Sequence, residues 1–292
     1  MIGFCVLLFG NQQKSDFTTF MKTVDFSEPG TFLLTAAFMF LGIFGRYVAI
    51  ALLFSVLVQG VYKDKFSPRQ VQKRPRRDRQ TQVEIGWSFF TSILFALAGA
   101  AMVLVWQKGF TKVYLEVNEY PLWWLPVSLI IVLFLHETYY YWLHRWMHRP
   151  SIYKYVHKVH HDSITTSAWT SFSFHPLESI LQAIFIPGLL FILPLHLYTI
   201  GLVLLIMTTT SVINHLNTEL YPQDFHTHWF GHWWIGATHH SLHHSQFRTN
   251  FGLYFTFWDK WMKTESPQYA RLFEEKTENS ISSIEKIEMK IH

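Results

Sequence analysis

The sequence predicts an all-α integral membrane protein with about four to five membrane helices and a cytoplasmic, histidine-rich helical cap. Half of its 292 residues are hydrophobic and only 15% are charged, whereas soluble domains carry about 25% charged residues. Sixteen of the seventeen histidines lie between His136 and His244, beside the apolar stretches. The single cysteine, Cys5, excludes a disulfide framework and a thiolate metal cluster within one chain.

Apolar stretches define the membrane part of this prediction, because a helix needs roughly 20 apolar residues to cross a bilayer. The candidates are residues 31–60, 87–106 and 121–135. A further apolar block, residues 177–213, is interrupted by Pro187 and Pro194. Proline disrupts a helix in lipid unless neighbours satisfy the freed backbone groups. This block is therefore expected to form either two full spans or one re-entrant hairpin.

A basic run predicts the sidedness of the chain. Residues 63–79 contain eight Lys or Arg residues. Such a run can bind nucleic acid, but apolar segments flank it on both sides. We interpret it as a cytoplasmic loop that contacts anionic headgroups, and we expect no nucleic-acid partner. The second and third spans then return the chain to the cytoplasm before the histidines. This multi-pass arrangement suits the endoplasmic reticulum of a eukaryote or the plasma membrane of a bacterium.

The chain is expected to divide into four successive segments. These are an N-terminal segment (1–30), membrane helices with the basic loop (31–135), a histidine-box region with the apolar hairpin (136–264) and a polar tail (265–292). The first ten residues lack a basic region and a full apolar region, so we do not interpret them as a signal peptide.

Eight histidines are spaced in a way that suits helices. They form the boxes HRWMH, HKVHH and HSLHH, made by His144 and His148, by His157, His160 and His161, and by His240, His243 and His244. Residues three and four apart project from one helix face, so each HxxHH box is expected to aim three imidazoles at one small volume. One first-row metal ion accepts roughly four to six ligands. Eight imidazoles therefore predict a dinuclear metal centre.

Further residues complete the predicted site. His215, after the last apolar block, is predicted as a ninth ligand. His175 is included as a tenth, with a helix-start or outer role as an equal alternative, and His239 is expected to lie outside the ligand set. Imidazoles that bind metal usually donate their other N–H to a carboxylate or carbonyl. The carboxylates expected to take this role, and therefore the candidate catalytic residues, are Glu137, Glu178, Glu219 and Asp259.

These boxes resemble the fatty acid hydroxylase superfamily, the sterol desaturase group of membrane di-metal oxygenases, over residues 120–264. The resemblance extends to the acidic-to-YWxHR run that begins at Glu137, to the HPLE element and to the closing segment NFGLYFTFWDKWMKT. The sterol C5-desaturase (lathosterol oxidase) branch is the most similar, because HRxxH, HKxHH, SFHPLES and FILPLH occur in order. At two positions where the family often has glycine, this chain has Asn217 and Lys263.

The resemblance implies an oxidoreductase that uses two non-haem iron ions and O₂ to desaturate or hydroxylate a lipid. A sterol is the expected substrate, with a fatty acid or sphingolipid as the alternative. The electrons would come from a separate cytochrome b5-like or ferredoxin-type donor, since the sequence has no haem, flavin or Fe–S motif. The residues alone leave the element open, because imidazole ligation suits zinc, copper, iron and nickel alike. Zinc is an alternative in the isolated protein.

Two other functional classes fit a histidine-rich membrane protein. A membrane zinc hydrolase would need a carboxylate base beside an open zinc position. A metal transporter would place its histidines within the spans, whereas these boxes follow the spans. A protein that merely stores metal is disfavoured, because loosely metal-binding histidine tracts are irregular.

Overall fold

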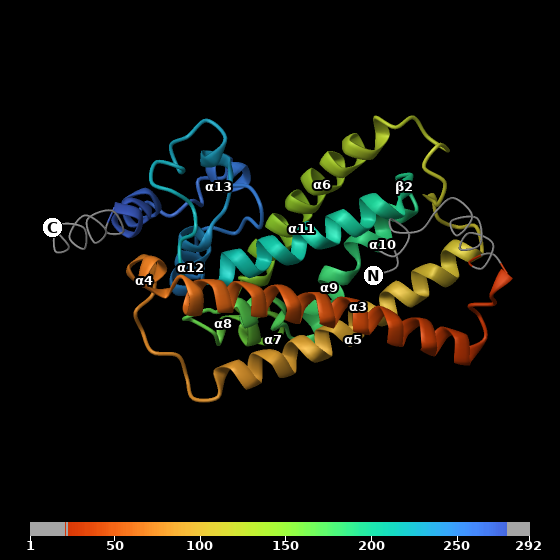
Figure 1. Cartoon of the computed structure of the whole chain (residues 1–292), viewed down its shortest axis with the longest axis horizontal. Coiled ribbons are helices and arrows are strands. Elements are labelled where there is room, and N and C mark those ends of the chain that lie inside the picture. Colours follow the sequence, from red (N-terminus) through yellow and green to blue (C-terminus); the bar gives the residue numbers. More distant parts are fainter. Residues whose placement is uncertain (1–20, 22, 279–292) are drawn as a thin grey trace. The chain divides into compact units, whose positions relative to one another are not determined.

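The computed structural model describes residue 21 and residues 23–278. Cys5, most of the N-terminal segment and the last fourteen residues of the polar tail lie outside this range. The long helices are α3 (Pro29–Val56), α5 (Gln80–Gln107), α6 (Trp124–Met147) and α11 (Leu197–His215) (Figure 1). The shorter helices are α4 (Lys63–Phe66), α7 (Pro150–Val156), α8 (Lys158–His161), α9 (Pro176–Ala183), α10 (Phe185–Leu190), α12 (Ala237–Gln246) and α13 (Phe257–Trp261). Strands β1 (Val113–Tyr114) and β2 (Leu195–His196) pair in parallel. The predicted all-α membrane fold class is confirmed.

Three helices of the described chain are long and apolar enough to cross a membrane. They are Pro29–Val61, in which a π-helical turn (Leu57–Val61) extends α3, Gln80–Gln107 and Leu197–His215. This is fewer than the four to five expected. The apolar start of α6 continues without a break into the polar run that begins at His136, so the helix is long but only half apolar.

The proline-broken block forms a short helical pair followed by one long helix. Pro187 lies inside α10 and Pro194 immediately precedes β2. The irregular backbone here is satisfied by its neighbours, as lipid would require. Leu190 accepts a hydrogen bond from the Lys112 N–H (2.8 Å), and Pro194 accepts one from the Trp124 indole (2.9 Å). Of the block, only α11 has the length of a full span.

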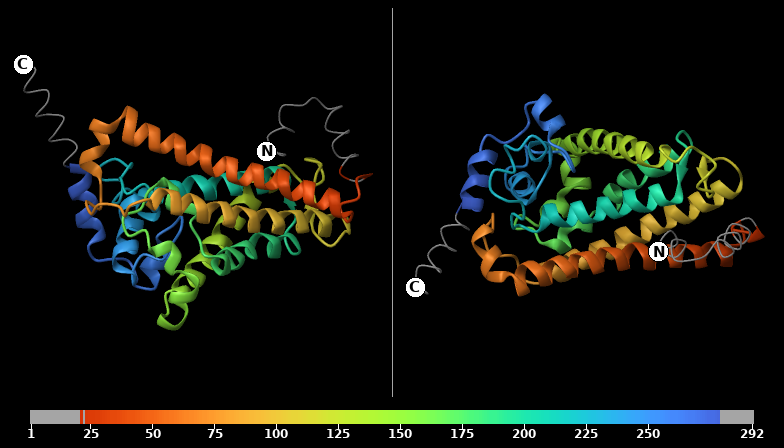
Figure 2. Two further views of the ribbon diagram at one scale, coloured as in Figure 1. Left: turned by 90° about the horizontal axis from the view of Figure 1, so that it is seen from below. Right: turned by 45° about the horizontal axis from the view of Figure 1, so that its top comes forward.

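Contacts divide the chain into two compact units that alternate along the sequence. Unit 1 takes residues up to 46, 89–136 and 176–207. Its apolar core is built around Val132, Leu190, Leu195 and Val203. Within this unit α3 and α5 lie side by side (Figure 2), with Phe40 and Phe44 both against the ring of Phe89. The four sequential segments expected from the sequence stay a prediction.

Unit 2 takes residues 47–88, 137–175 and those from 208 onwards. It contains all three histidine boxes, α7, α8, α12, α13 and a final helical stretch over residues 269–278. In its apolar core, Leu242 of α12 packs with Tyr269 and Phe273 of that final stretch. The helix that carries HSLHH is thus held from its outer side by the C-terminal part of the described chain.

Candidate metal centre

Nine of the ten histidines predicted as ligands converge in unit 2. They come from the C-terminal end of α6, from α8 and its N-cap, from the last residue of α11 and from α12. They are His144, His148, His157, His160, His161, His215, His240, His243 and His244. All are buried except His148, which is half-buried.

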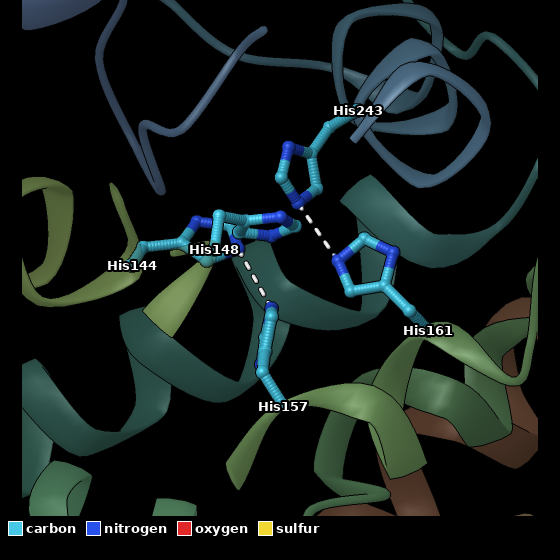
Figure 3. A group of neighbouring side chains, drawn as sticks. All are labelled: His144, His148, His157, His161 and His243. Atoms are coloured by element: carbon cyan, nitrogen blue, oxygen red, sulfur yellow. Dashed lines mark hydrogen bonds between the residues drawn. The ribbon is translucent and has the colours of Figure 1, made fainter. Parts of the chain in front are cut away.

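The nine imidazoles form two groups, and within each group the ligand atoms lie within 4.8 Å of one another. Group A consists of His144, His148, His157, His161 and His243. Group B consists of His160, His215, His240 and His244. Figure 3 shows the five rings of group A pointing toward one another from three helical segments. The groups adjoin each other, since the rings of His161 and His244 stack at 4.5 Å.

Each HxxHH box is divided between the two groups. In α12, His240 and His244 belong to group B, whereas His243 belongs to group A. The box at α8 does the reverse, because only its middle histidine, His160, belongs to group B. On a helix with 3.6 residues per turn, residues four apart are rotated by about 40° and residues three apart by about 60° in the opposite sense. The structure therefore differs from the expected arrangement of three imidazoles aimed at one small volume.

In group B, the ring nitrogens of His160 and His215 face each other without a proton to share. His160 donates its Nδ1–H to the Ser173 carbonyl (3.4 Å), and His215 donates its Nδ1–H to the Ser211 carbonyl (2.7 Å). A carbonyl only accepts and a neutral imidazole carries one N–H, so both Nε2 atoms hold lone pairs. These two Nε2 atoms are 3.2 Å apart, and His240 Nε2 lies 2.9 Å from that of His215. A cation among them would turn a repulsive contact into ligation.

Group A has a related arrangement, in which one ring of each close pair is shown to hold an Nε2 lone pair. The Nε2 atoms of His144 and His157 are 3.0 Å apart, and so are those of His161 and His243. His144 and His243 each donate Nδ1–H to a backbone carbonyl, which leaves a lone pair on each Nε2. His148 Nε2 is buried and has no hydrogen-bond partner. Buried ring nitrogens are rarely left unpaired, and a bound metal ion would satisfy this one.

Burial keeps these rings in the form that binds metal. Removal from water, followed by the neighbouring rings, holds the pKa of six imidazoles well below the usual range: His157, His160, His161, His240, His243 and His244. The same burial lowers the pKa of His148 to about 2. Neutral imidazole, and not imidazolium, has the lone pair that a metal ion needs. The donor set thus fits two first-row metal ions, one on five imidazoles and one on four.

One loop, residues 249–256, orients two ligands of group A. The Thr249 carbonyl accepts the His243 Nδ1–H at 2.7 Å, and the Phe251 carbonyl accepts the His144 Nδ1–H at 2.8 Å. These hydrogen bonds select the ring tautomer that presents Nε2 to a metal ion. The expected role of the carboxylates, to accept these N–H groups, is therefore taken by backbone carbonyls in the structure.

Glu137 holds the loop from α6. Its fully buried carboxylate accepts the backbone N–H groups of Leu253 (3.1 Å), Tyr254 (2.6 Å) and Phe255 (3.3 Å). A Cβ on Gly252 would lie 2.7 Å from the Phe255 carbonyl oxygen and 3.0 Å from Glu137 Oε1, so the close approach requires glycine. Glu137 acts on the ligands through this backbone.

Asp259 holds the other side of the same loop. It accepts the N–H groups of Phe251 and Gly252, both at 2.9 Å, and the Thr264 hydroxyl at 2.7 Å. His239 Nε2 lies 3.9 Å from Asp259 Oδ2, and His239 belongs to neither group, as expected from its direction on α12. Asp259 and Glu137 together clamp the segment that carries the Phe251 carbonyl.

Glu219 lies at the beginning of α12. Its carboxylate accepts the Thr238 N–H of the first turn at 2.9 Å and the Tyr221 N–H at 3.0 Å. A carboxylate at this end of a helix both satisfies a free N–H group and complements the helix dipole. Because α12 carries ligands of both groups, Glu219 supports both.

Two predicted site residues belong to neither group. His175 precedes α9, and its ring centroid lies 6.2 Å from that of Trp87. Glu178 is buried in unit 1, where it accepts a hydrogen bond from Gln182 (3.1 Å). The structure therefore assigns neither residue to the convergent imidazoles.

Glu84 was not singled out from the sequence, yet it is the most heavily hydrogen-bonded carboxylate behind the site. It is 1% exposed, forms an ion pair with Arg76 (3.0 Å) and accepts from Gln80 (2.7 Å). It also accepts the hydroxyl groups of three residues after HKVHH: Ser163, Ser167 and Thr170. The sequence offered one signal for Glu84, which is that it is a single acidic residue near the start of an apolar helix.

The two departures from the family pattern have a common structural basis. Asn217 and Lys263 adopt φ values of 54° and 55°, in the left-handed region that glycine enters at little cost. Asparagine tolerates this conformation, and the Asn217 side chain binds the Gln72 backbone through both its amide groups (2.8 and 2.9 Å). Lysine has no such compensation at its own position.

Residues 129–264 match the family model described as fatty acid hydroxylase, and this range contains all nine convergent imidazoles. The matched range covers a little under half of the chain. The resemblance predicted from the boxes is thereby confirmed. No solved structure matches the chain.

Curated relatives of this domain include sterol-oxidising proteins. The chain is 32% identical over 197 residues to a Delta(7)-sterol 5(6)-desaturase of Gibberella zeae, covering 66% of this chain and 58% of that protein. It is 32% identical over 163 residues to lathosterol oxidase of Rattus norvegicus (55% and 52%) and 30% identical over 184 residues to that of Homo sapiens (62% and 60%). The matched part thus spans little more than half the length of these relatives.

Proposed function

We propose that this protein is a membrane-bound lipid oxidoreductase that uses two non-haem iron ions, O₂ and external electrons to desaturate or hydroxylate a sterol-class lipid. The observation that carries the proposal is the pair of Nε2 lone pairs that His160 and His215 present to each other in group B. Nine neutral imidazoles, eight of them buried and one half-buried, suit two metal ions better than a hydrogen-bonded core. The substrate class, a sterol, and the type of reaction, an oxidation, are proposed from the names of the curated relatives.

The chain's own residues bind and orient. Group A would hold one ion with five imidazoles and group B the other with four, so a six-coordinate ion would keep at least one position open in each. When bound, such ions supply the oxidising chemistry that an unactivated C–H bond requires. The clamped loop at 249–256 fixes ring tautomers, and the buried surroundings exclude water from the reacting groups.

The proposed location and partners follow from the membrane helices. His215 is the last residue of α11 and HRWMH extends the C-terminal end of α6, so ligands occupy helix ends. We place that end in the cytoplasm because the basic run 63–79 follows α3. There the site would be open to a separate electron donor, while its lipid substrate would come from the bilayer.

Metal content is the first test. Purified protein is expected to contain two iron ions per chain, and His160→Ala is expected to contain fewer and to lose turnover. His228→Ala removes an exposed histidine of the same unit and is the matched control, which should keep both properties. A His160→Ala protein with two metal ions and full activity would contradict the ligand assignment.

Turnover is the second test. Membranes supplied with O₂, a reductant and a sterol mixture are expected to yield products that have lost two hydrogens or gained one oxygen, by mass spectrometry. The same incubation without O₂ should yield neither. Lipid hydrolysis that continues without O₂ and reductant would instead indicate a zinc hydrolase, and transmembrane metal flux without lipid oxidation would indicate a transporter.

A further inference from the structure

The basic run 63–79 includes a segment that forms hydrogen bonds with two other parts of the chain. Seven of its eight cationic residues, Arg76 among them, are exposed, but Arg69 is only 5% exposed. Residues 69–77, which we name the strap, lie between the end of the first span and the start of α5. The strap contacts two separate segments. One follows the HKVHH box in the sequence, and the other follows His215.

The first contact joins the strap to residues 217–221, immediately after the ligand His215. Val71 donates its N–H to the Asn217 carbonyl (2.9 Å), and Glu219 donates its N–H to the Arg69 carbonyl (3.1 Å). Gln70 and Thr218 form an antiparallel bridge between these two hydrogen bonds. The Arg69 guanidinium also donates to the Tyr221 carbonyl. This pairing is a short two-stranded ladder with a buried cation at one end.

The second contact joins the strap to residues 162–170, immediately after HKVHH. The Arg74 carbonyl accepts the Thr165 hydroxyl at 3.0 Å. Arg76 donates to Ser167 (3.1 Å) and pairs with the buried Glu84 (3.0 Å). The Arg76 side chain is 32% exposed and that of Glu84 is 1% exposed, so the carboxylate of the pair is withdrawn from water. Ser167 in turn caps the 3₁₀ turn Ala168–Phe172.

These two contacts converge on group B. Ser173, which follows the 3₁₀ turn, provides the carbonyl that orients His160. Asn217, two residues beyond His215, is held by the strap at its backbone and side chain. His160 and His215 are the pair whose Nε2 atoms face each other at 3.2 Å. The strap is thus bonded to both chain segments that bring this pair together.

We infer that the strap, through the Arg76–Glu84 pair, is a positioning device that sets the separation of His160 and His215 and thereby the affinity of group B for its ion. The inference rests on the proposed metal site and goes beyond it, since neither Arg76 nor Glu84 touches a ligand. It also replaces the simplest view of the basic run as a headgroup-binding loop. On that view all its cations would be equivalent, whereas here Arg76 has a specific structural role.

Cobalt(II) titration of the metal-free full-length protein in nanodiscs tests the inference. Wild type is expected to bind two equivalents. Arg76→Gln should bind one of them about 10-fold or more weakly, the range seen when a residue behind a metal ligand is lost. Lys73→Gln removes the same charge from an exposed position of the same segment and should titrate as wild type. Equal titrations for Arg76→Gln and Lys73→Gln would overturn the inference.

Two further variants show which ion is affected. With His243→Ala, which leaves group B intact, Arg76→Gln should weaken the remaining ion, whereas with His244→Ala, which leaves group A intact, it should not. A general loss of stability would weaken both, and this result would contradict the inference. Glu84→Gln should match Arg76→Gln, and the double variant should be no weaker than Glu84→Gln alone, because coupled residues are not additive. A wild type that binds fewer than two equivalents would refute the metal site itself.

Discussion

Group A and group B share α8 and α12, but group A also draws on α6 and group B on α11, and the two are supported differently. Group A has five imidazoles, of which one is half-buried, and two of them are oriented by the single loop 249–256. Group B has four fully buried imidazoles, oriented by Ser173 and Ser211 from separate parts of the chain. Group A therefore depends on the conformation of one loop, whereas group B depends on how two chain segments are held together.

The largest expected effect comes from the two neighbouring histidines of α12. His243→Ala should remove an ion from group A, and His244→Ala should remove one from group B, each with more than about a 100-fold loss of activity, since a direct ligand matters more than the residues behind it. Elemental analysis and cobalt spectra of the two variants should differ. If both variants lost the same ion, the division of the HSLHH box would be wrong.

An intermediate effect is expected from the clamp on loop 249–256. Glu137→Gln keeps the size of the side chain but turns an NH₂ group toward backbone N–H donors at Leu253 to Phe255. Affinity for cobalt in group A should fall about 10–100-fold while group B is unchanged. Asp64→Asn, at an exposed carboxylate in α4, is the control. A Glu137→Gln protein that loses affinity only in group B would reverse the comparison.

The smallest effects are expected at the two left-handed positions. Lys263→Gly, behind group A, should raise stability by about 1 kcal/mol, because a non-glycine residue is strained at φ 55°. Asn217→Gly, behind group B, should lower it, because two hydrogen bonds to Gln72 worth about 1 kcal/mol each are lost. Thermal unfolding in detergent measures both. Shifts of the same sign would show that backbone strain alone governs these sites.

Much of the fold could be predicted because apolar length is a local property. The first span was expected at 31–60 and is found at Pro29–Val61, and the second was expected at 87–106 and is found in α5. The start of α5 was missed because its helical turns continue through the polar residues 80–86. The helix α6, which is only half apolar, shows the limit of predicting spans from the sequence. Because this helix continues without a break, its length does not reveal where its contact with lipid would end.

The candidate ligands could be named because their spacing is visible in the sequence, but their grouping was not inferred. It follows from helix rotation, which sends His160 and His243 away from their box partners. The acceptors behind the ligands could not be predicted, because backbone carbonyls at Ser173 or Phe251 carry no side-chain signal. Glu84 was missed for a related reason. It contacts the HKVHH segment only after the chain has folded back on itself.

The spacing of the two proposed metal positions depends in part on α12. His243 and His244 are joined by a single peptide unit, yet they serve different groups. A helix is a rigid element with a rise of about 1.5 Å per residue. Movement of a loop therefore does not change the distance between the backbone positions of His243 and His244. The rigid backbone of α12 therefore limits how far the two groups can move apart.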